Sequence, residues 1–247
     1  MVEICCRRYP KIGIHGRVVH ELGREIVRGI IRQHEKLPNE AALISRFKSS
    51  RTALREAFRV LAAKGLLEAR QRTGTIVRGK KYWNLIDPDI LAWQSLESLG
   101  PDGVRSLMEC RLITEPAVAK LVARSASEEQ ANDLGKICIA MGRAEQSGSR
   151  EAVFNTKLHF HMALFEICHN DLLKRQRDVI QKILTYEFHQ QNIHGNHPYG
   201  TAKNYAFIVE KIRVRNSVAA EQSFRTLIEK ENSILEGFMS GLESIVA

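Results

Sequence analysis

The chain is poor in the features that mark membrane, secreted and zinc-binding proteins. No segment of its 247 residues approaches the roughly 20 consecutive apolar residues of a membrane-spanning helix. The N-terminus has no apolar signal-peptide core. The five cysteines are odd in number and fit no Cys-x-x-Cys zinc spacing. We therefore expect a cytoplasmic protein with free thiols and no membrane partner.

Catalytic signatures are also missing. The sequence contains no phosphate-binding loop, no Gly-rich nucleotide turn and no set of nucleophile, base and acid. His159 and His161 precede Cys168 at helical spacing, which is typical of core side chains. We expect no enzyme and no cofactor. The alternative is an enzyme with a DNA-binding appendage, which turnover of a sugar acid or a nucleotide would indicate.

Charge is distributed unevenly along the chain. Residues 1–80 hold 18 Lys and Arg against 7 Asp and Glu, a net charge of +11, whereas residues 81–247 hold 19 against 21. A basic first third joined to a nearly neutral remainder indicates a nucleic-acid module fused to a sensing or assembly module. The alternative is a basic surface that only faces solvent.

The basic third contains a short helical pattern rich in arginine. Arg51, Arg55 and Arg59 recur at helical spacing and line one side, while apolar residues at positions 54, 58 and 61 face a core. We expect Ser50 to cap this arginine-rich helix, and Asn39 to cap the shorter helix that precedes it over 40–47. The expected elements are helices over 16–33, 40–47 and 51–64 and strands over 66–70 and 75–78, joined by a polar tip at 71–74. This is the layout of a winged helix-turn-helix, which places its second helix in a DNA major groove.

The rest of the chain reads as helical throughout, so the fold class is mainly α: a winged helix-turn-helix followed by an antiparallel helical bundle. We expect Tyr82, Trp83 and Trp93 of the connector to pack the two domains against each other. The expected helices cover 101–124, 128–146, 150–168, 171–193, 200–215 and 217–238. The expected divisions are a leader at 1–15, the winged module at 16–79, a connector with a short helix at 80–100, and an effector-binding and dimerisation domain at 101–240.

The first 80 residues resemble the GntR family of bacterial transcription regulators. The matching pieces are Leu37–Glu40, Ser50–Ala57, Leu61–Leu66 and the wing glycine Gly74. The remainder resembles the FadR-type ligand-binding domain called FCD, through Arg111–Ala117, Phe160–His161, Leu164, Asn170, Ile208, Ile212 and Ala220. The connector over 83–93 further resembles the galactonate-operon repressors of this group.

The resemblance implies a set of DNA contacts to a double-stranded operator. Arg51 and Arg55 are expected to reach bases or phosphates, and a bidentate Arg–guanine contact discriminates by about 1–3 kcal/mol. Where the family usually has an arginine after the glutamate of Leu-Pro-x-Glu, this chain has Ala41, so one expected contact is missing. The full predicted set is Ser50, Arg51, Thr52, Ala53 and Arg55 on the helix and Arg72, Thr73 and Gly74 on the wing.

The same resemblance bears on the ligand site. The family often holds a divalent metal with one Asp and three His, but the corresponding positions here are Lys157, His161, Tyr205 and Leu227. One imidazole does not hold a metal, so we predict none. His189, His194 and His197 are expected at the surface; the alternative is that they rebuild a metal site. Lys157 and Arg111 are predicted to pair the carboxylate of an effector, with His161 and Tyr205 beside them. The alternative is that Lys157 points to solvent or pairs with a carboxylate such as Glu115.

Together these features predict a homodimeric, ligand-responsive transcriptional repressor of sugar-acid catabolism that resembles the galactonate type. The alternatives are a metal-independent regulator that responds to another anionic metabolite, and a DNA binder that needs no effector.

Overall fold

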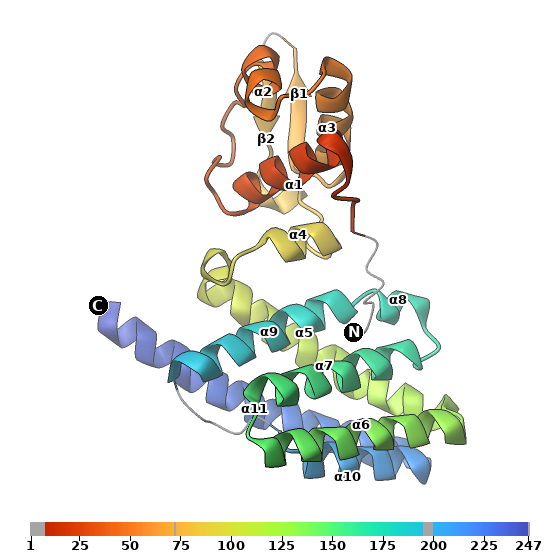
Figure 1. The fold of residues 1–247 in the computed structure, drawn as a ribbon. Coiled ribbons are helices and arrows are strands. Elements are labelled where there is room, and N and C mark those ends of the chain that lie inside the picture. The colour runs from red at the N-terminus through yellow and green to blue at the C-terminus, as the bar shows by residue number, and fades with distance from the viewer. Residues whose placement is uncertain (1–7, 72, 195–199, 247) are drawn as a thin grey trace. The chain divides into compact units, whose positions relative to one another are not determined.

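The computed structural model describes residues 8–71, 73–194 and 200–246 (Figure 1). The chain divides into two compact units, of which the first ends at Gly100 and the second begins at Pro101. Within the described residues, every helix is too short or too polar to cross a bilayer.

The first unit is a small winged helix-turn-helix. Asn39 and Ser50 cap their helices as predicted: the Asn39 side chain accepts from Ala42 N at 2.8 Å, and Ser50 Oγ accepts from Ala53 N at 3.1 Å. The elements are α1 (Gly13–Val27), α2 (Glu40–Phe47), α3 (Arg51–Ala63), β1 (Leu67–Arg70), β2 (Gly74–Val77), a 3-10 turn (Lys80–Tyr82) and α4 (Pro88–Trp93).

The first helix is shorter than predicted. It ends at Val27 rather than near residue 33, because Gly29 has φ of +76° and turns the chain out of the helix. The residues that follow were assigned to this helix, but they instead lead into a short extended segment. In that segment Leu37 N donates to Thr75 O, and Lys36 forms an antiparallel β-bridge with Ile76. The segment therefore lies along β2 as a third extended stretch of the wing.

The two strands of the wing form an antiparallel ribbon close to the predicted one. Leu67 pairs with Val77 at its base, and Arg70 pairs with Gly74 at its tip. Gly74 has φ of +95°, a backbone conformation that glycine adopts without steric cost. The short turn therefore depends on glycine at this position.

The tryptophans of the connector belong to the core of the first unit. Trp93 packs on α1, where its ring leaves no room for a Cβ at Gly23, and its Nε1 donates to His20 Nδ1 at 3.0 Å. Trp83 lies in the same apolar cluster. Within this unit α4 is thus a fourth core helix, and the predicted packing of these aromatic residues between the domains stays a prediction.

The second unit is a bundle of long helices. Its apolar core draws on residues of α5, α6, α7, α9, α10 and α11. In Figure 1, α6 lies beside α7 and α10, and α10 also contacts α11. The elements are α5 (Leu96–Ser125), α6 (Glu128–Ser147), α7 (Arg150–Glu166), α8 (Asp171–Lys174), α9 (Arg177–His194), α10 (Ala202–Arg213) and α11 (Ser217–Val246).

One of the helices predicted for this unit is divided in the structure. The single helix expected over 171–193 is interrupted by a turn at residues 175–176, which separates α8 from α9. The assigned span of α5 begins at Leu96, but it contains a break at Gly100, where φ is +63° and ψ is 171°. The helix that carries the ligand-site residues therefore starts at Pro101, as predicted.

Candidate nucleic-acid interface and buried ionic site

Helix α3 presents one polar face to solvent. Leu54 and Leu61 are fully buried, which turns Arg51, Thr52 and Arg55 outward, and the Ser50 cap lies at the exposed start of the helix. Phe58, predicted to face the core, is half-buried and packs against it, and Ala57 is a buried member of the same core. The exposed N-terminal turn is the part of a recognition helix that reaches base edges.

The arginines of this face differ in their partners. Arg59 pairs with Glu56 at 2.6 Å, and Arg55 Nε lies 3.7 Å from Glu40 Oε1. Arg51 pairs with no carboxylate among the residues that the structure describes. Exposed pairs of this kind contribute at most about 1 kcal/mol, so the Glu40 contact does not withhold Arg55 from a phosphate or a base.

The wing adds a cation that the sequence reasoning missed. Thr73 and Gly74 are exposed at the tip as predicted, whereas Arg72 lies outside the described residues. Lys36 runs alongside the tip, and its Cε would be 3.2 Å from a Cβ at Gly74. The sequence did not predict this position, because Lys36 lies in none of the expected strands. Its β-bridge to Ile76 of β2 is what brings it to the wing.

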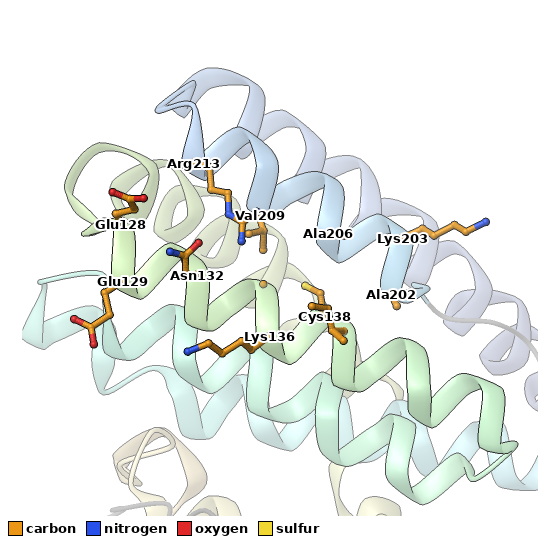
Figure 2. A pocket seen from close by; sticks show the side chains of 12 residues that line it. Glu128, Glu129, Asn132, Lys136, Cys138, Ala202, Lys203, Ala206, Val209 and Arg213 are labelled. Carbon is orange, nitrogen blue, oxygen red and sulfur yellow. The ribbon is translucent and has the colours of Figure 1, made fainter.

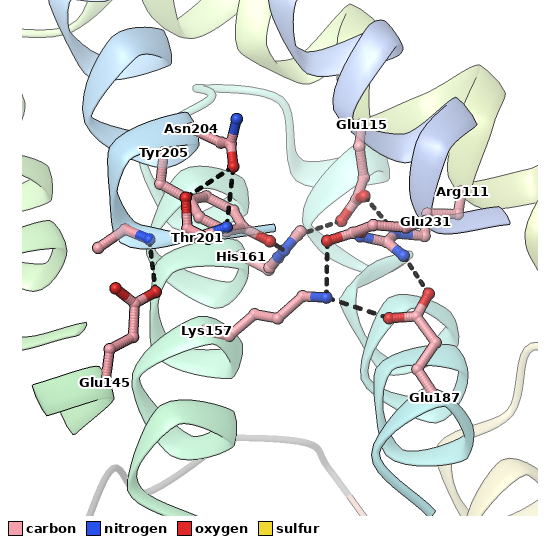
Figure 3. Close-up of polar contacts among 11 residues, drawn as sticks. Arg111, Glu115, Glu145, Lys157, His161, Glu187, Thr201, Asn204, Tyr205 and Glu231 are labelled. Atoms are coloured by element: carbon pink, nitrogen blue, oxygen red, sulfur yellow. Dashed lines mark hydrogen bonds and ion pairs between the residues drawn. The ribbon is translucent and has the colours of Figure 1, made fainter. Parts of the chain in front are cut away.

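The second unit encloses a cluster of ionisable side chains. Five helices contribute to it, and every member is at least nine-tenths buried. Figure 3 shows how these side chains converge between the helices. We call it the buried ion cluster, and its members are Arg111 and Glu115 on α5, Lys157 and His161 on α7, Glu187 on α9, Tyr205 on α10 and Glu231 on α11.

Arg111 is the hub of this cluster. Its three guanidinium nitrogens each contact a different carboxylate: Nε donates to Glu115 at 2.8 Å, while the two terminal nitrogens donate to Glu187 and Glu231. The side chain has no solvent-exposed surface. A planar fork of donors suits such multiple pairing better than an ammonium group does.

Lys157 and His161 complete the pairing. Lys157 Nζ donates to Glu187 Oε2 at 3.1 Å and to Glu231 Oε1 at 2.9 Å. His161 Nδ1 lies 2.5 Å from Glu115 Oε1, and its Nε2 lies 3.0 Å from the Tyr205 hydroxyl. Each of the six carboxylate oxygens therefore has a nitrogen partner.

The pairing shifts the acid–base equilibria of the cluster. Burial alone would raise the pKa of Glu231, but the charges of Lys157 and Arg111 outweigh it and lower that pKa to about 2. Burial likewise opposes ionisation of Glu115, and His161 and Arg111 together hold its pKa below the usual value. The Tyr205 pKa is raised well above its usual value, chiefly by burial. The two carboxylates are therefore charged at neutral pH and the phenol is not.

The structure brings all four predicted effector residues together. It also shows that Arg111 and Lys157 already form ion pairs with glutamates of the bundle. Lys157 pairs with Glu187 and Glu231, not with Glu115 as the alternative prediction had it. Whether a ligand binds there stays a prediction. The sequence did carry a signal for both glutamates, since each interrupts an apolar stripe: Ile180, Ile183, Leu184 and Glu187 on α9, and Phe224, Leu227, Ile228 and Glu231 on α11.

A divalent metal does not fit this arrangement. The Lys157 ammonium stands where Glu187 and Glu231 converge, and a metal there would meet its positive charge. Across the ranges that the structure describes, no group of three or more His, Cys, Asp or Glu side chains could hold a metal ion. His189 is exposed, as predicted, while His197 lies outside those ranges and the side chain of His194 is not described.

Two hollows open on the surface of the second unit. One, of about 970 Å³, lies between α6 and α10, with Cys138, Val209 and Arg213 in its lining (Figure 2). None of its lining residues belongs to the buried ion cluster. The other, which we call the α10–α11 groove, has about 550 Å³ and includes Glu231 in its lining; its other polar lining residues include Lys203, Asn204, Ser223, Thr226 and Lys230.

Comparison with known proteins matches both units to one family. Residues 14–77 match the model of bacterial regulatory proteins of the gntR family, and residues 106–230 match the FCD domain. The galactonate operon transcriptional repressor of Escherichia coli is 31% identical over 215 residues, which cover 86% of this chain and 92% of that protein. The Uxu operon regulator of Haemophilus influenzae is 24% identical over 229 residues, covering 90% and 80%.

A solved structure has the same fold. Lar, which controls the expression of the Listeria monocytogenes agr system, superposes with a TM-score of 0.57 at 18% identity, covering 90% of this chain and 96% of that one. The relatives are transcription regulators, so the prediction that the chain is not an enzyme is confirmed. The chain belongs to the GntR family of DNA-binding transcription regulators, in the group that carries an FCD domain.

Proposed function

We propose that this regulator is a homodimeric repressor of an operon for sugar-acid catabolism, and that a sugar acid releases it from its operator. The proposal is supported by the names of its relatives, a galactonate operon repressor and a Uxu operon regulator, both of which align over most of this chain. Such regulation places the repressor in the cytoplasm beside its DNA.

The observation that carries the DNA-binding part is the exposed N-terminal turn of α3. Arg51 has no carboxylate partner among the described residues, and Ser50, Thr52 and Arg55 surround it on the same exposed turn, with the half-buried Ala53 beside them. On the wing, Thr73 and Gly74 supply an exposed tip. Two copies of this module, one helical turn of DNA apart, would read a palindrome, which is why we propose a homodimer.

The experiment is operator binding by matched arginine variants. An operator is first selected from a random DNA pool with the purified protein. Affinity is then measured by fluorescence anisotropy at fixed salt for wild type, Arg51→Ala, Arg55→Ala and Arg59→Ala. Loss of a base contact of about 1–3 kcal/mol weakens binding by roughly 5- to 150-fold. Arg59 is the control, because it lies two turns into the helix and already pairs with Glu56.

Equal affinity of the Arg51 and Arg59 variants would contradict the proposed interface. Recovery of no preferred sequence from the pool would contradict specific operator binding altogether. Release by galactonate and by hexuronates is tested on the same complex, with glucose as the uncharged control.

A second candidate function is a DNA binder that needs no effector. It is favoured by one observation, the complete pairing of Arg111 and Lys157 with internal carboxylates. Operator binding that is unchanged by every sugar acid at millimolar concentration would select it over the ligand-responsive repressor.

A further inference from the structure

Glu231 belongs both to the buried ion cluster and to the lining of the α10–α11 groove. Its side chain is 1% exposed, so its carboxylate is nearly sealed from solvent. Two cations, Lys157 and Arg111, contact that carboxylate inside the bundle. One residue of the groove lining therefore also contacts a pair of buried positive charges.

The groove lining combines the apolar Phe207, Leu227 and Ile234 with polar groups that suit a hydroxylated anion. Lys203 and Lys230 are exposed there, and in the described part of the chain neither pairs with a carboxylate. Ser223 and Thr226 add hydroxyl groups to the α11 side. Ammonium groups attract a carboxylate, and hydroxyls exchange hydrogen bonds with sugar hydroxyls.

The backbone before α10 lies directly against the Glu231 carboxylate. At Gly200 a Cβ would stand 2.6 Å from Glu231 Oε1 and 3.1 Å from Tyr205 Cε2, and φ is +33°. A glycine is therefore needed for this close approach. If the carboxylate moved, the backbone at Gly200, just before α10, would lose or change this contact. Helix α10 also carries Tyr205, which contacts His161.

We propose that Glu231 is an internal stand-in for a ligand carboxylate. A hydroxylated carboxylate enters the α10–α11 groove and takes over the contacts of Glu231 with Lys157 and Arg111, while the Glu231 side chain turns outward to the groove. The inference rests on the proposed response to a sugar acid and names where that acid binds and what it displaces.

The exchange conserves charge inside the bundle. Removing Glu231 without a replacement leaves buried cations without one of their partners, and an uncompensated buried charge is strongly destabilising. Replacing one carboxylate by another keeps the same charge balance around Lys157 and Arg111. The ligand then shifts the bundle only by the difference in its affinity for the two states.

Glu187 provides a matched control, because it contacts the same two cations but is not part of the groove lining. The experiment is chemical rescue of full-length Glu231→Ala and Glu187→Ala by sodium acetate. Thermal midpoints are recorded in 100 mM sodium acetate and in sodium chloride of equal ionic strength. Both variants are expected to melt below wild type in chloride.

The expected result is selective rescue. Acetate should raise the midpoint of Glu231→Ala by about 4 °C or more, while wild type and Glu187→Ala shift by less than about 1 °C. Equal rescue of both variants would overturn entry through the groove. Absence of rescue in Glu231→Ala would overturn the displaceable carboxylate itself.

A second variant covers the case in which Glu231→Ala does not fold. Glu231→Gln keeps the shape of the side chain but removes its charge, which weakens its contacts with Lys157 and Arg111. The affinity of this variant for gluconate, measured by calorimetry, should therefore be at least tenfold higher than that of wild type. Lys230→Met should weaken gluconate binding, whereas Lys136→Met on α6 should not. Unchanged affinity in Glu231→Gln would overturn the inference. Operator affinity without ligand is measured alongside, so failure of the proposed DNA-binding function is seen separately.

Discussion

Replacement of the hub of the buried ion cluster gives the sharpest test of its energetics. In Arg111→Met three carboxylates would remain in a closed interior with Lys157 and His161 as partners. Breaking a buried pair by removing one partner costs about 3–5 kcal/mol. For a chain of this size, 1 kcal/mol shifts the melting midpoint by roughly 2–4 °C, so we expect a drop on the order of 10 °C.

The assay can assign that loss to one unit. Both tryptophans of the chain, Trp83 and Trp93, lie in the first unit, so tryptophan emission follows the unfolding of that unit. Far-UV circular dichroism is dominated by the long helices of the second unit. Arg111→Met should lower the dichroism midpoint and leave the tryptophan midpoint within about 1 °C of wild type.

Two comparisons make the measurement decisive. Arg111→Lys keeps the charge but not the fork, and should lose part of the stability. Lys120→Met breaks a partly exposed pair with Glu221 on the same bundle and should cost no more than about 1 kcal/mol. If Arg111→Met costs no more than Lys120→Met, the cluster does not behave as a buried ionic network and the reasoning is wrong.

Three further predictions concern single positions. The Glu231 pKa is lowered from 4.5 to about 2, so ionised Glu231 stabilises the fold above about pH 4.5, and this contribution, on the order of 3 kcal/mol, is lost as pH falls toward 2. Urea midpoints between pH 6 and pH 2.5 should fall more steeply in wild type than in Glu231→Gln, and equal slopes would contradict the shift. Gly23→Ala should destabilise the first unit by about 1–3 kcal/mol despite the better helix former, because its Cβ would lie 2.4 Å from the Trp93 ring; an unchanged or raised tryptophan-emission midpoint would refute this. Ser50→Ala should cost about 1 kcal/mol through loss of the α3 cap, whereas Ser50→Gly should cost only a few tenths, and equal losses in urea titrations would exclude a capping role.

Much of the fold could be read from the sequence because its signals are local. The caps at Asn39 and Ser50 depend on side chains within four residues of the helix starts. The position of Lys36 beside the wing and that of Trp93 on Gly23 depend on tertiary contacts. No local pattern distinguishes a lysine before a helix from one on a sheet edge, so these two features could not be predicted.

The sequence predicted only some of the residues of the buried ion cluster. Arg111, Lys157, His161 and Tyr205 could be gathered through family resemblance, but Glu187 and Glu231 were absent from the prediction, and they decide the electrostatics of the site. Both occupy core positions of amphipathic helices. A charged residue at such a position is a signal for a buried partner, because an unpaired buried carboxylate would be protonated or expelled.

Stability alone does not explain a network of this kind. Apolar side chains of similar volume would pack the same space with equal or greater stability, since the desolvation of buried ions offsets most of their attraction. A network of carboxylates and cations offers something that an apolar core does not, because one carboxylate can be replaced by another with no change in charge. In this bundle the replaceable member is the one beside the groove, Glu231, and Gly200 connects it to α10. A ligand that competes with a side chain shifts the population of states only by the difference in its affinity for them, and a nearly complete switch needs a difference of about 5.5 kcal/mol. The contacts that hold Glu231 in the absence of ligand are therefore the contacts for which a ligand carboxylate would compete.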